Sequence, residues 1–344
     1  MPSPTSPDYI IISGGASGLV VARHLSENPD VQVWVLEAGK DLSVDPRVNI
    51  PALWTSLVGS DADWQYKSVS QPGLGGHTLI LLPDQATLEH VGIDWINDEH
   101  RGTSGPIKVS FPDIIQDPLC KAWIDAFRGL GKVTTADPFS GNSIGGYSNT
   151  ATVDPETKIR SYANSSYGAP IRRRPNVRIL TEAKVQRTLF TKTRDGTVKA
   201  TGVHALVEGK TETFTPTKEV ILASGVFNIP KLLDRLPRVK GPKDSEYYNT
   251  PGGKRNHPDA IRVGDLDGAK KYVLDTATTA YHGCGSAAMM PREKGGVVNP
   301  KLVVYGTKNI RVVNANVIPL IPRGNIFSSV YAVAEKAAGI IKGH

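Results

Sequence analysis

Cysteine and long apolar runs are scarce in this chain of 344 residues. Cys120 and Cys284 are its two cysteines, too few for a disulfide framework, and no cluster of cysteine and histidine predicts a zinc or other metal site. No stretch approaches the roughly 18 consecutive apolar residues of a membrane span, and the start lacks the basic and apolar regions of a signal peptide. The sequence alone therefore predicts a cytoplasmic protein with no membrane partner.

Long blocks of like charge are also lacking, although the formal net charge is +7. The densest basic run is Arg172, Arg173 and Arg174, which is most simply a solvated loop. A nucleic-acid surface needs a recognisable module as well as positive charge, and the sequence contains none, so no nucleic-acid partner is expected. What remains is a mild attraction for anionic small molecules, including the phosphates of a cofactor.

The apolar pattern predicts an α/β fold that begins with a β-α-β unit. Residues 9–12 and 31–37 have the composition of buried strands, and residues 19–26 between them have helical spacing. Such a unit within about 30 residues is the shortest parallel crossover. Further strands are predicted at 105–111 and 219–224, antiparallel strands at 177–180, 184–191, 201–208 and 210–214, and helices at 117–130, from 230, and at 326–341.

A glycine-rich turn joins the first predicted strand to the first helix. It consists of Ser13 followed by Gly14, Gly15, Ala16, Ser17 and Gly18, so that serine replaces the first glycine of a G-x-G-x-x-G pattern. Gly15 permits close approach of a pyrophosphate, Gly18 permits helix–strand packing, and the helix N-terminus attracts the phosphate charge. Glu37, at the end of the second strand, is placed to accept hydrogen bonds from an adenosine ribose, which favours FAD or NAD over NADP.

Several segments resemble the glucose–methanol–choline (GMC) family of FAD-dependent oxidoreductases. They are residues 8–18, 35–39, 61–64, 71–74, 174–177, 183–185, 219–225, 279–291, 295–298, 302–306, 309–315 and 318–336, of which the stretch around His282 is the most specific. The resemblance implies a Rossmann-type FAD-binding domain with a reduced α+β substrate domain, FAD as cofactor, and a small-molecule alcohol as substrate. The reaction it implies is oxidation of a CH–OH group by hydride transfer to the flavin.

The resemblance also divides the chain and assigns residues. It implies FAD-binding segments at 1–78, 171–236 and 277–344, a partial substrate region at 79–170, and a linker or remnant at 237–276. His282 matches the family's catalytic base, and Asn325 matches a position that orients the substrate oxygen. The remaining matched positions belong to the cofactor site: Ala38 beside Glu37, Val185 against the adenine, Asn314 and Ala315 against the flavin chain, and Ile326 at the start of the last helix.

Two family signatures are interrupted, and this leaves alternatives open. The sequence after Gly76 and the sequence after Leu233 both depart from the family pattern, and most of the substrate-domain sheet is missing. One alternative is a catalytically inactive, truncated member of the family. Another is a lyase or cyclase of the same fold that keeps FAD without redox chemistry. A plain NAD-binding protein is disfavoured, because the histidine segment has no place in it; without the resemblance, a structural role for His282 is as plausible as a catalytic one.

Overall fold

The computed structural model describes residues 6–67, 80–81, 105–110, 118–132, 140, 145–147, 150–233, 282–322 and 324–343. The predictions for residues 237–276 and for the ends of the two interrupted signatures lie outside these ranges. The chain separates into two compact units, the first made of residues 1–40, 58–84 and 171–344 and the second of residues 41–57 and 85–170. The division into five sequence segments stays a prediction.

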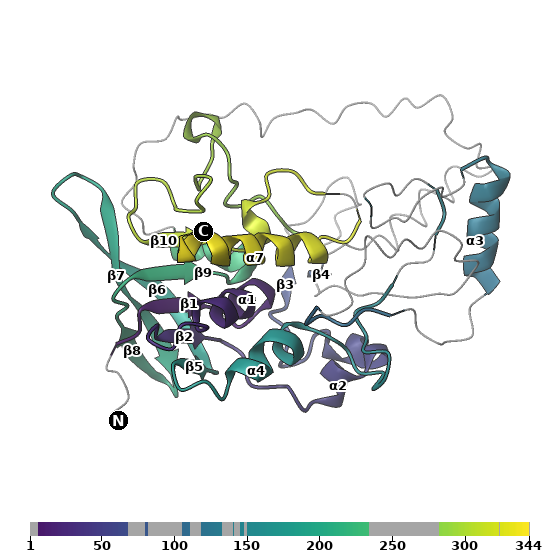
Figure 1. The fold of residues 1–344 in the computed structure, drawn as a ribbon, viewed down its shortest axis with the longest axis horizontal. Helices are drawn as coiled ribbons and strands as arrows, with labels where there is room; N and C mark the ends of the chain where they lie inside the picture. Colours follow the sequence, from purple (N-terminus) through teal and green to yellow (C-terminus); the bar gives the residue numbers. More distant parts are fainter. Residues whose placement is uncertain are drawn as a thin grey trace. The chain divides into compact units, whose positions relative to one another are not determined.

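A parallel sheet of five strands forms the centre of the first unit (Figure 1). In spatial order its strands are β10 (Ile310–Val312), β9 (Glu219–Leu222), β1 (Tyr9–Ile12), β2 (Val33–Leu36) and β5 (Val177–Leu180). The side chains of Ile10, Ile11 and Val35 are completely buried, as are most of those of β9. Strands apolar on both sides are typical of a parallel sheet covered on both faces.

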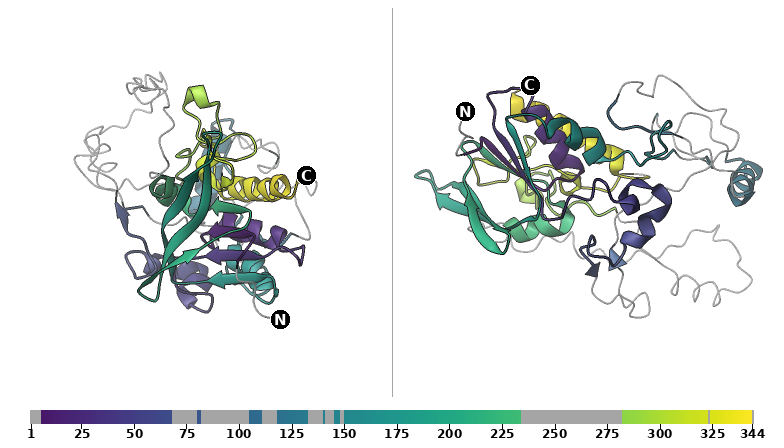
Figure 2. Two further views of the ribbon diagram at one scale, coloured as in Figure 1. Left: turned by 90° about the vertical axis from the view of Figure 1, so that its left-hand side faces the viewer. Right: turned by 90° about the horizontal axis from the view of Figure 1, so that it is seen from below.

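Alternation along the strands assigns a layer to each face. Ile11 lies on the face covered by helix α1 (Ala16–Leu25), because a Cβ added to Gly18 of that helix would lie 3.3 Å from the Ile11 Cγ2. Trp34 points to the opposite face and meets the ring of Phe214 edge-on, with 6.0 Å between the centroids. Phe214 belongs to an antiparallel meander of β6 (Ala183–Lys192), β7 (Val198–Val207) and β8 (Lys210–Phe214). Figure 2 shows α1 and the last helix on one side of the parallel strands and the meander on the other.

Two further helices complete the first unit. Helix α5 (Gly225–Leu233) follows β9, and α7 (Phe327–Lys342) packs beside α1.

The first unit also contains two short strands, β3 (Tyr66–Lys67) and β4 (Ile80–Leu81), which pair antiparallel. No helix in the described part of the chain combines the length and the apolar character that a transmembrane segment needs.

The second unit is smaller and mostly helical or irregular. It contains α2 (Pro46–Asn49), a 3₁₀ helix (Pro51–Leu57), α3 (Pro118–Gly129), a π-helical turn (Asn164–Gly168) and the beginning of α4 (Ala169–Ile171). Its two sequence segments are joined by a hydrogen bond of 2.9 Å from the Arg160 N–H to the Asn49 carbonyl. Helix α3 confirms the helix that the sequence predicted at 117–130.

Three predictions about elements were wrong. Residues 105–110 form no strand, and Ser110 makes a single bridge to Ala151. The strand at 177–180 was predicted to be antiparallel but pairs parallel to β2. The prediction failed because the alternation of a short edge strand gives no information about the direction of its partner. The helix expected from residue 230 already begins at Gly225, since Pro230 lies inside α5 rather than at its start.

Asn309 joins the meander to the parallel sheet. Its Oδ1 accepts from the Ala200 N–H at 2.7 Å, and its Nδ2 donates to the carbonyls of Ala200 at 2.9 Å and Lys218 at 3.1 Å. The Asn309 side chain is 7% exposed, so these backbone groups have little access to water as a replacement partner. One amide therefore satisfies three backbone groups, two in β7 and one in the residue just before β9.

We expect the Asn309→Ala variant to lose about 2–4 kcal/mol of unfolding free energy, because it leaves buried backbone groups unpaired. Urea unfolding measures this loss. The control is Asn28→Ala, in which the lost Oδ1 accepts a single local hydrogen bond from Asp30 in an exposed turn. A change within about 0.5 kcal/mol is expected for the control, and equal losses in the two variants would contradict the assignment.

Candidate functional site at the carboxyl edge of the sheet

The register of the parallel strands brings distant segments to one edge. Ile12 pairs with Leu36 on one side and with Leu222 on the other, and Leu222 pairs with Val312. The four strands therefore end at the same level. The residues that follow them share this edge: the turn 13–18, Glu37 and Ala38, Ser224 and Gly225, and Asn314 and Ala315. In open parallel sheets, ligands bind outside the carboxyl ends of the strands where the strand order reverses, which here is beside β1.

The glycine turn has the geometry of a phosphate cradle. Gly15 precedes α1 as its N-cap without a side chain to cap the helix, so the first N–H groups of α1 remain available. A Cβ on Gly18 would lie 2.0 Å from the Ser13 carbonyl oxygen, which excludes any side chain there. A Cβ on Gly15 would meet the Ser13 Oγ at 3.5 Å and nothing closer, so the fold itself tolerates one. The close packing predicted for Gly18 is thus seen, whereas the approach of a pyrophosphate to Gly15 stays a prediction.

Glu37 lies against this turn and is held there by three donors. Its Oε2 accepts from the Gly14 N–H at 2.7 Å and from the Ser13 hydroxyl at 3.1 Å, and its Oε1 accepts from the Gly39 N–H at 2.9 Å. The Glu37 main chain is fixed as well, because its carbonyl accepts from the Ala183 N–H at 2.8 Å. Val185, half-buried two residues further along β6, is on the same face of that strand as Ala183.

Several buried polar atoms at this edge lack a hydrogen-bond partner among the described residues. They are the Oγ atoms of Ser17 and Ser224 and the Nδ2 of Asn314. Ser17 is 2% exposed and Asn314 is 5% exposed, so water cannot easily serve them. An unsatisfied buried group costs about 1–3 kcal/mol, and a polar cofactor that supplies partners removes this cost. The edge therefore fits a polar, phosphate-bearing ligand such as FAD.

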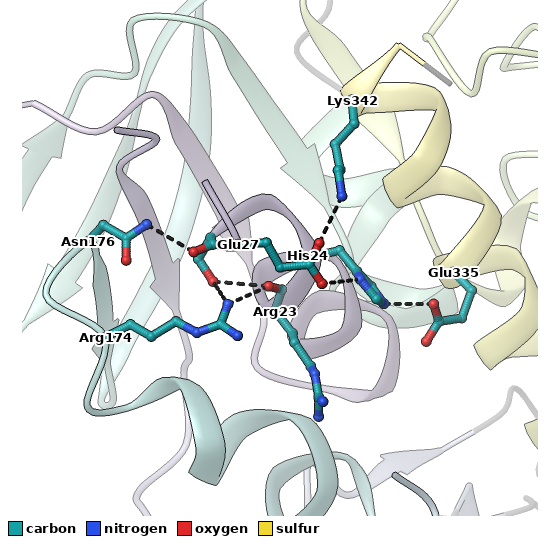
Figure 3. A network of polar contacts seen from close by, with 8 residues as sticks. Arg23, His24, Glu27, Arg174, Asn176, Glu335 and Lys342 are labelled. Carbon is teal, nitrogen blue, oxygen red and sulfur yellow. Dashed lines mark hydrogen bonds and ion pairs between the residues drawn. The ribbon is translucent and has the colours of Figure 1, made fainter. Parts of the chain in front are cut away.

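The last helix brings its N-terminus to the same level as that of α1. His24, the ninth residue of α1, contacts Glu335, the ninth residue of α7, at 2.7 Å, and Glu27 contacts Lys342 at 2.8 Å (Figure 3). Glu27 lies two residues beyond the end of α1 and is four positions out of step with Lys342, so the order of the two contacts shows only that α1 and α7 run in the same direction. The contact between their ninth residues places the first turns of the two helices at a similar height, since both helices rise 1.5 Å per residue. Asn325 is exposed just before α7, and Ile326, its N-cap, is 8% exposed.

The C-terminal end of α1 is fixed by two residues from the segment before β5. Arg174 donates from Nη1 to the carbonyl of Arg23 and to the hydroxyl of Ser26, both at 2.7 Å (Figure 3). Asn176 donates to the carbonyls of Ser26, Asn28 and Val31 at 2.9–3.1 Å. A cation at a helix C-terminus is favourable to the helix dipole. These contacts hold α1, and with it the glycine turn, in a fixed orientation on the sheet.

The segment of His282 is attached to the same edge. Gly283 lies directly against α5, since a Cβ on it would be 2.8 Å from the Val226 Cγ1. Ser286 donates to the Val226 carbonyl at 3.0 Å and accepts from Asn316, and the Gly285 N–H donates to the Ala315 carbonyl at 3.4 Å. The imidazole of His282 is half-buried. The structure therefore brings His282 into the unit that carries the glycine turn, Asn314 and Ala315.

Cys284, two residues after His282, lacks the lowered pKa that an activated thiol nucleophile needs. Burial raises the pKa of its thiol, so that the neutral form dominates near pH 7.

Some contacts at this edge were not predicted from sequence. The hydroxyl of Ser13 on Glu37 and the pair of Ser286 with Asn316 join positions that are 24 and 30 residues apart. Ser13 was visible only as a departure from the glycine pattern. Nothing in local spacing indicates that Ser286 contacts Asn316, because that contact depends on the tertiary path of the chain.

Comparison with known proteins assigns the family. A profile described as GMC oxidoreductase matches residues 8–236 with its N-terminal domain and residues 216–334 with its C-terminal domain. The chain belongs to the GMC oxidoreductase family. This membership makes FAD the cofactor of the chain, and the glycine turn and Glu37 stay its predicted binding residues. It confirms the Rossmann-type FAD-binding fold, whereas the roles of the individual site residues stay predictions.

Individual relatives agree with the family and differ in length. The chain is 30% identical to dehydrogenase mpl7 of Monascus purpureus over 334 residues, an alignment that covers 82% of this chain and 52% of that protein. It is similar in fold to pyridoxine 4-oxidase from Mesorbium loti, with a TM-score of 0.78 at 18% identity and coverage of 98% and 100% of the two chains. The GMC chain thus spans about half the length of the first curated relatives it matches.

The missing length is internal with respect to at least one relative. A glucose oxidase-like protein of Humicola fuscoatra aligns over 558 positions that take in 98% of this chain and 95% of the relative, at 23% identity. An alignment longer than the 344 residues of the chain requires insertions in the relative between matched segments. The interruptions seen after Gly76 and Leu233 are consistent with this.

Gly18→Ala is expected to lower the unfolding free energy by about 2–4 kcal/mol, because the added methyl overlaps the Ser13 carbonyl. Gly15→Ala should change it by less than about 1 kcal/mol, because Gly15 has φ −77° and an open Cβ position. The same Gly15→Ala variant should nevertheless lose FAD, because its methyl intrudes where a pyrophosphate approaches the turn. Urea unfolding and flavin content after reconstitution measure the two effects; full flavin retention by Gly15→Ala would contradict the cradle.

The pair of Glu27 and Lys342 gives a pH-dependent prediction. The hydrogen bond from Lys342 outweighs partial burial and, with His24, lowers the Glu27 pKa below its ordinary 4.5. The contribution of the pair to stability is therefore present above pH 4.5 and is lost as the pH falls through the lower pKa of the folded state. Lys342→Ala should cost less than about 1 kcal/mol at pH 7, because the pair is partly exposed.

The cost of Lys342→Ala should shrink toward zero in acid. Unfolding free energies measured from pH 7 downward test this, with the exposed Lys336→Ala on the same helix as control. A cost independent of pH would show that Lys342 acts through packing rather than through Glu27.

Proposed function

We propose that this chain is an FAD-dependent oxidoreductase that oxidises the CH–OH group of a small alcohol, with His282 as the base and Asn325 as the residue that orients the substrate oxygen. The observation that carries the proposal is the attachment of the His282 segment to the same sheet edge as the glycine turn. The Gly285 N–H contacts the Ala315 carbonyl, and Ala315 follows the strand that ends level with β1. Family membership supplies the reaction class.

The chain's own residues supply proton transfer and orientation. Bound FAD supplies the acceptor for a hydride from the alcohol carbon. His282 accepts the hydroxyl proton as the carbonyl bond forms, which suits an imidazole because its charge changes near neutral pH. Asn325 is an amide and cannot act as a base, but it can donate to the substrate oxygen. The uncapped first turn of α7 adds positive potential beside Asn325, where negative charge is favoured.

The shortened chain makes loss of catalysis the main competing outcome. Internal segments that longer relatives possess are missing here, and a site that excludes water is needed for strong electrostatic stabilisation. An inactive family member would bind flavin weakly or not at all. A lyase or cyclase would bind flavin that substrates never reduce. One experiment separates these three outcomes.

We expect the purified, FAD-reconstituted protein to lose its flavin absorbance when it is mixed anaerobically with members of a panel of small alcohols. The His282→Ala variant should bind FAD but be reduced about 10²–10⁴-fold more slowly, because the proton acceptor is gone.

The matched control is His204→Ala on β7, whose imidazole contacts Arg187 away from the sheet edge. It should reduce flavin at the rate of the unaltered protein. Flavin that is bound and never bleached would overturn the redox assignment, and unchanged bleaching in His282→Ala would overturn the role of His282.

A further inference from the structure

Ser13 has a backbone conformation that glycine normally occupies in this turn. Its φ is +93°, in a region that side chains disfavour, and it is the first residue of the phosphate turn. The G-x-G-x-x-G pattern places glycine here because the tight turn demands this conformation. A serine is retained at this position despite the backbone strain, which directs attention to what its hydroxyl contacts.

The hydroxyl of Ser13 connects the turn to the ribose-binding acid. Its Oγ donates to Glu37 Oε2 at 3.1 Å and accepts from the Gly15 N–H at 3.3 Å. A glycine at position 13 could make neither contact. The strained residue therefore forms a link between the N-cap of α1 and the end of β2 that the glycine pattern does not provide.

The acceptor capacity of Glu37 shows what this link does. A carboxylate has about four acceptor sites, and three are occupied by Ser13, Gly14 and Gly39. The remaining site is on Oε1, because Oε2 already accepts two hydrogen bonds. With the carboxylate fixed in this way, an incoming hydroxyl meets one free acceptor in one orientation.

We propose that Ser13 is a positioning residue that pre-orders the Glu37 carboxylate, so that its free Oε1 site binds a hydroxyl of the adenosine ribose. The proposal rests on the assignment of this edge to FAD. It adds that the backbone strain of Ser13 is offset by a higher affinity for the ligand. The pre-ordering lowers the cost of fixing the acid when the ligand binds. Replacement of Ser13 by glycine should therefore lower the affinity for the ligand while it relieves the backbone strain.

The test uses ADP, which has the adenosine and pyrophosphate of FAD, and 2′,3′-dideoxy-ADP, which lacks both ribose hydroxyls. Binding to the flavin-free full chain is measured by calorimetry. We expect Ser13→Gly to weaken ADP about tenfold, the effect of one lost hydrogen bond to a charged group, and to leave dideoxy-ADP unchanged. Its urea midpoint should not fall by as much as that of Ser13→Ala, which loses the same hydroxyl but keeps the strain.

A second arm keeps the result specific to Glu37. In a Glu37→Gln background, Ser13→Gly should weaken ADP much less than tenfold, because the charged acceptor is already gone. Equal weakening of ADP and dideoxy-ADP would overturn the proposal, since Ser13 would then act through the Gly15 N–H and the phosphate. Failure of the unaltered chain to bind ADP would overturn the cofactor site as well. The bleaching of flavin by alcohols tests the proposed function separately, and its outcome does not depend on the role of Ser13.

Discussion

The register of the parallel strands is the constraint on which the rest of this structure depends. Ile12, Leu36, Leu222 and Val312 end their strands at one level, although they are separated by up to 300 positions in sequence. Parallel pairing requires a crossover after every strand, so each strand is followed by a turn at the same edge. The strand register therefore brings the glycine turn, Glu37 and Asn314 to one edge, and direct hydrogen bonds then join Glu37 to the turn. A slip of one residue in β2 would turn Glu37 to the other face of the sheet and remove the acid from the cradle.

The amount of structure that sequence could predict follows from the range of each interaction. The unit from β1 to β2 was predicted because buried strands, a helical period and a glycine turn are local signals, and α3 and α7 were predicted within one or two residues. The direction of β5 was wrong because a four-residue edge strand shows nothing of its partner. The sequence predicted that Gly18 is needed for close packing, because the glycine pattern has this role, but it did not identify the Ser13 carbonyl as the group in contact. The contact of Ser13 with Glu37 was not predicted, because it depends on a backbone angle.

The antiparallel meander shows how a shortened chain still covers its sheet. Trp34 of β2 meets Phe214, and Arg178 lies 5.0 Å above the Trp34 ring, so one large side chain is covered from two directions. Asn309 supplies the polar counterpart by satisfying backbone groups of β7 and of the segment before β9. Both contacts lie on the face away from α1. The meander therefore covers this face with one aromatic contact and one buried amide, both made by described residues.

The polar atoms at the carboxyl edge explain why this geometry points to a ligand rather than to a turn that only packs. Ser17 and Asn314 are almost fully buried, yet each has a polar atom without a partner among the described residues. A structural turn would gain stability if these side chains were apolar, since unpaired buried groups are costly. By contrast, Gly14 and Ser13 both donate to Glu37 of the chain itself. The edge thus combines an acid held by three donors with buried polar groups that lack a partner among the described residues. We infer that adenosine recognition needs little rearrangement, while the partners of Ser17 and Asn314 come with the rest of the cofactor.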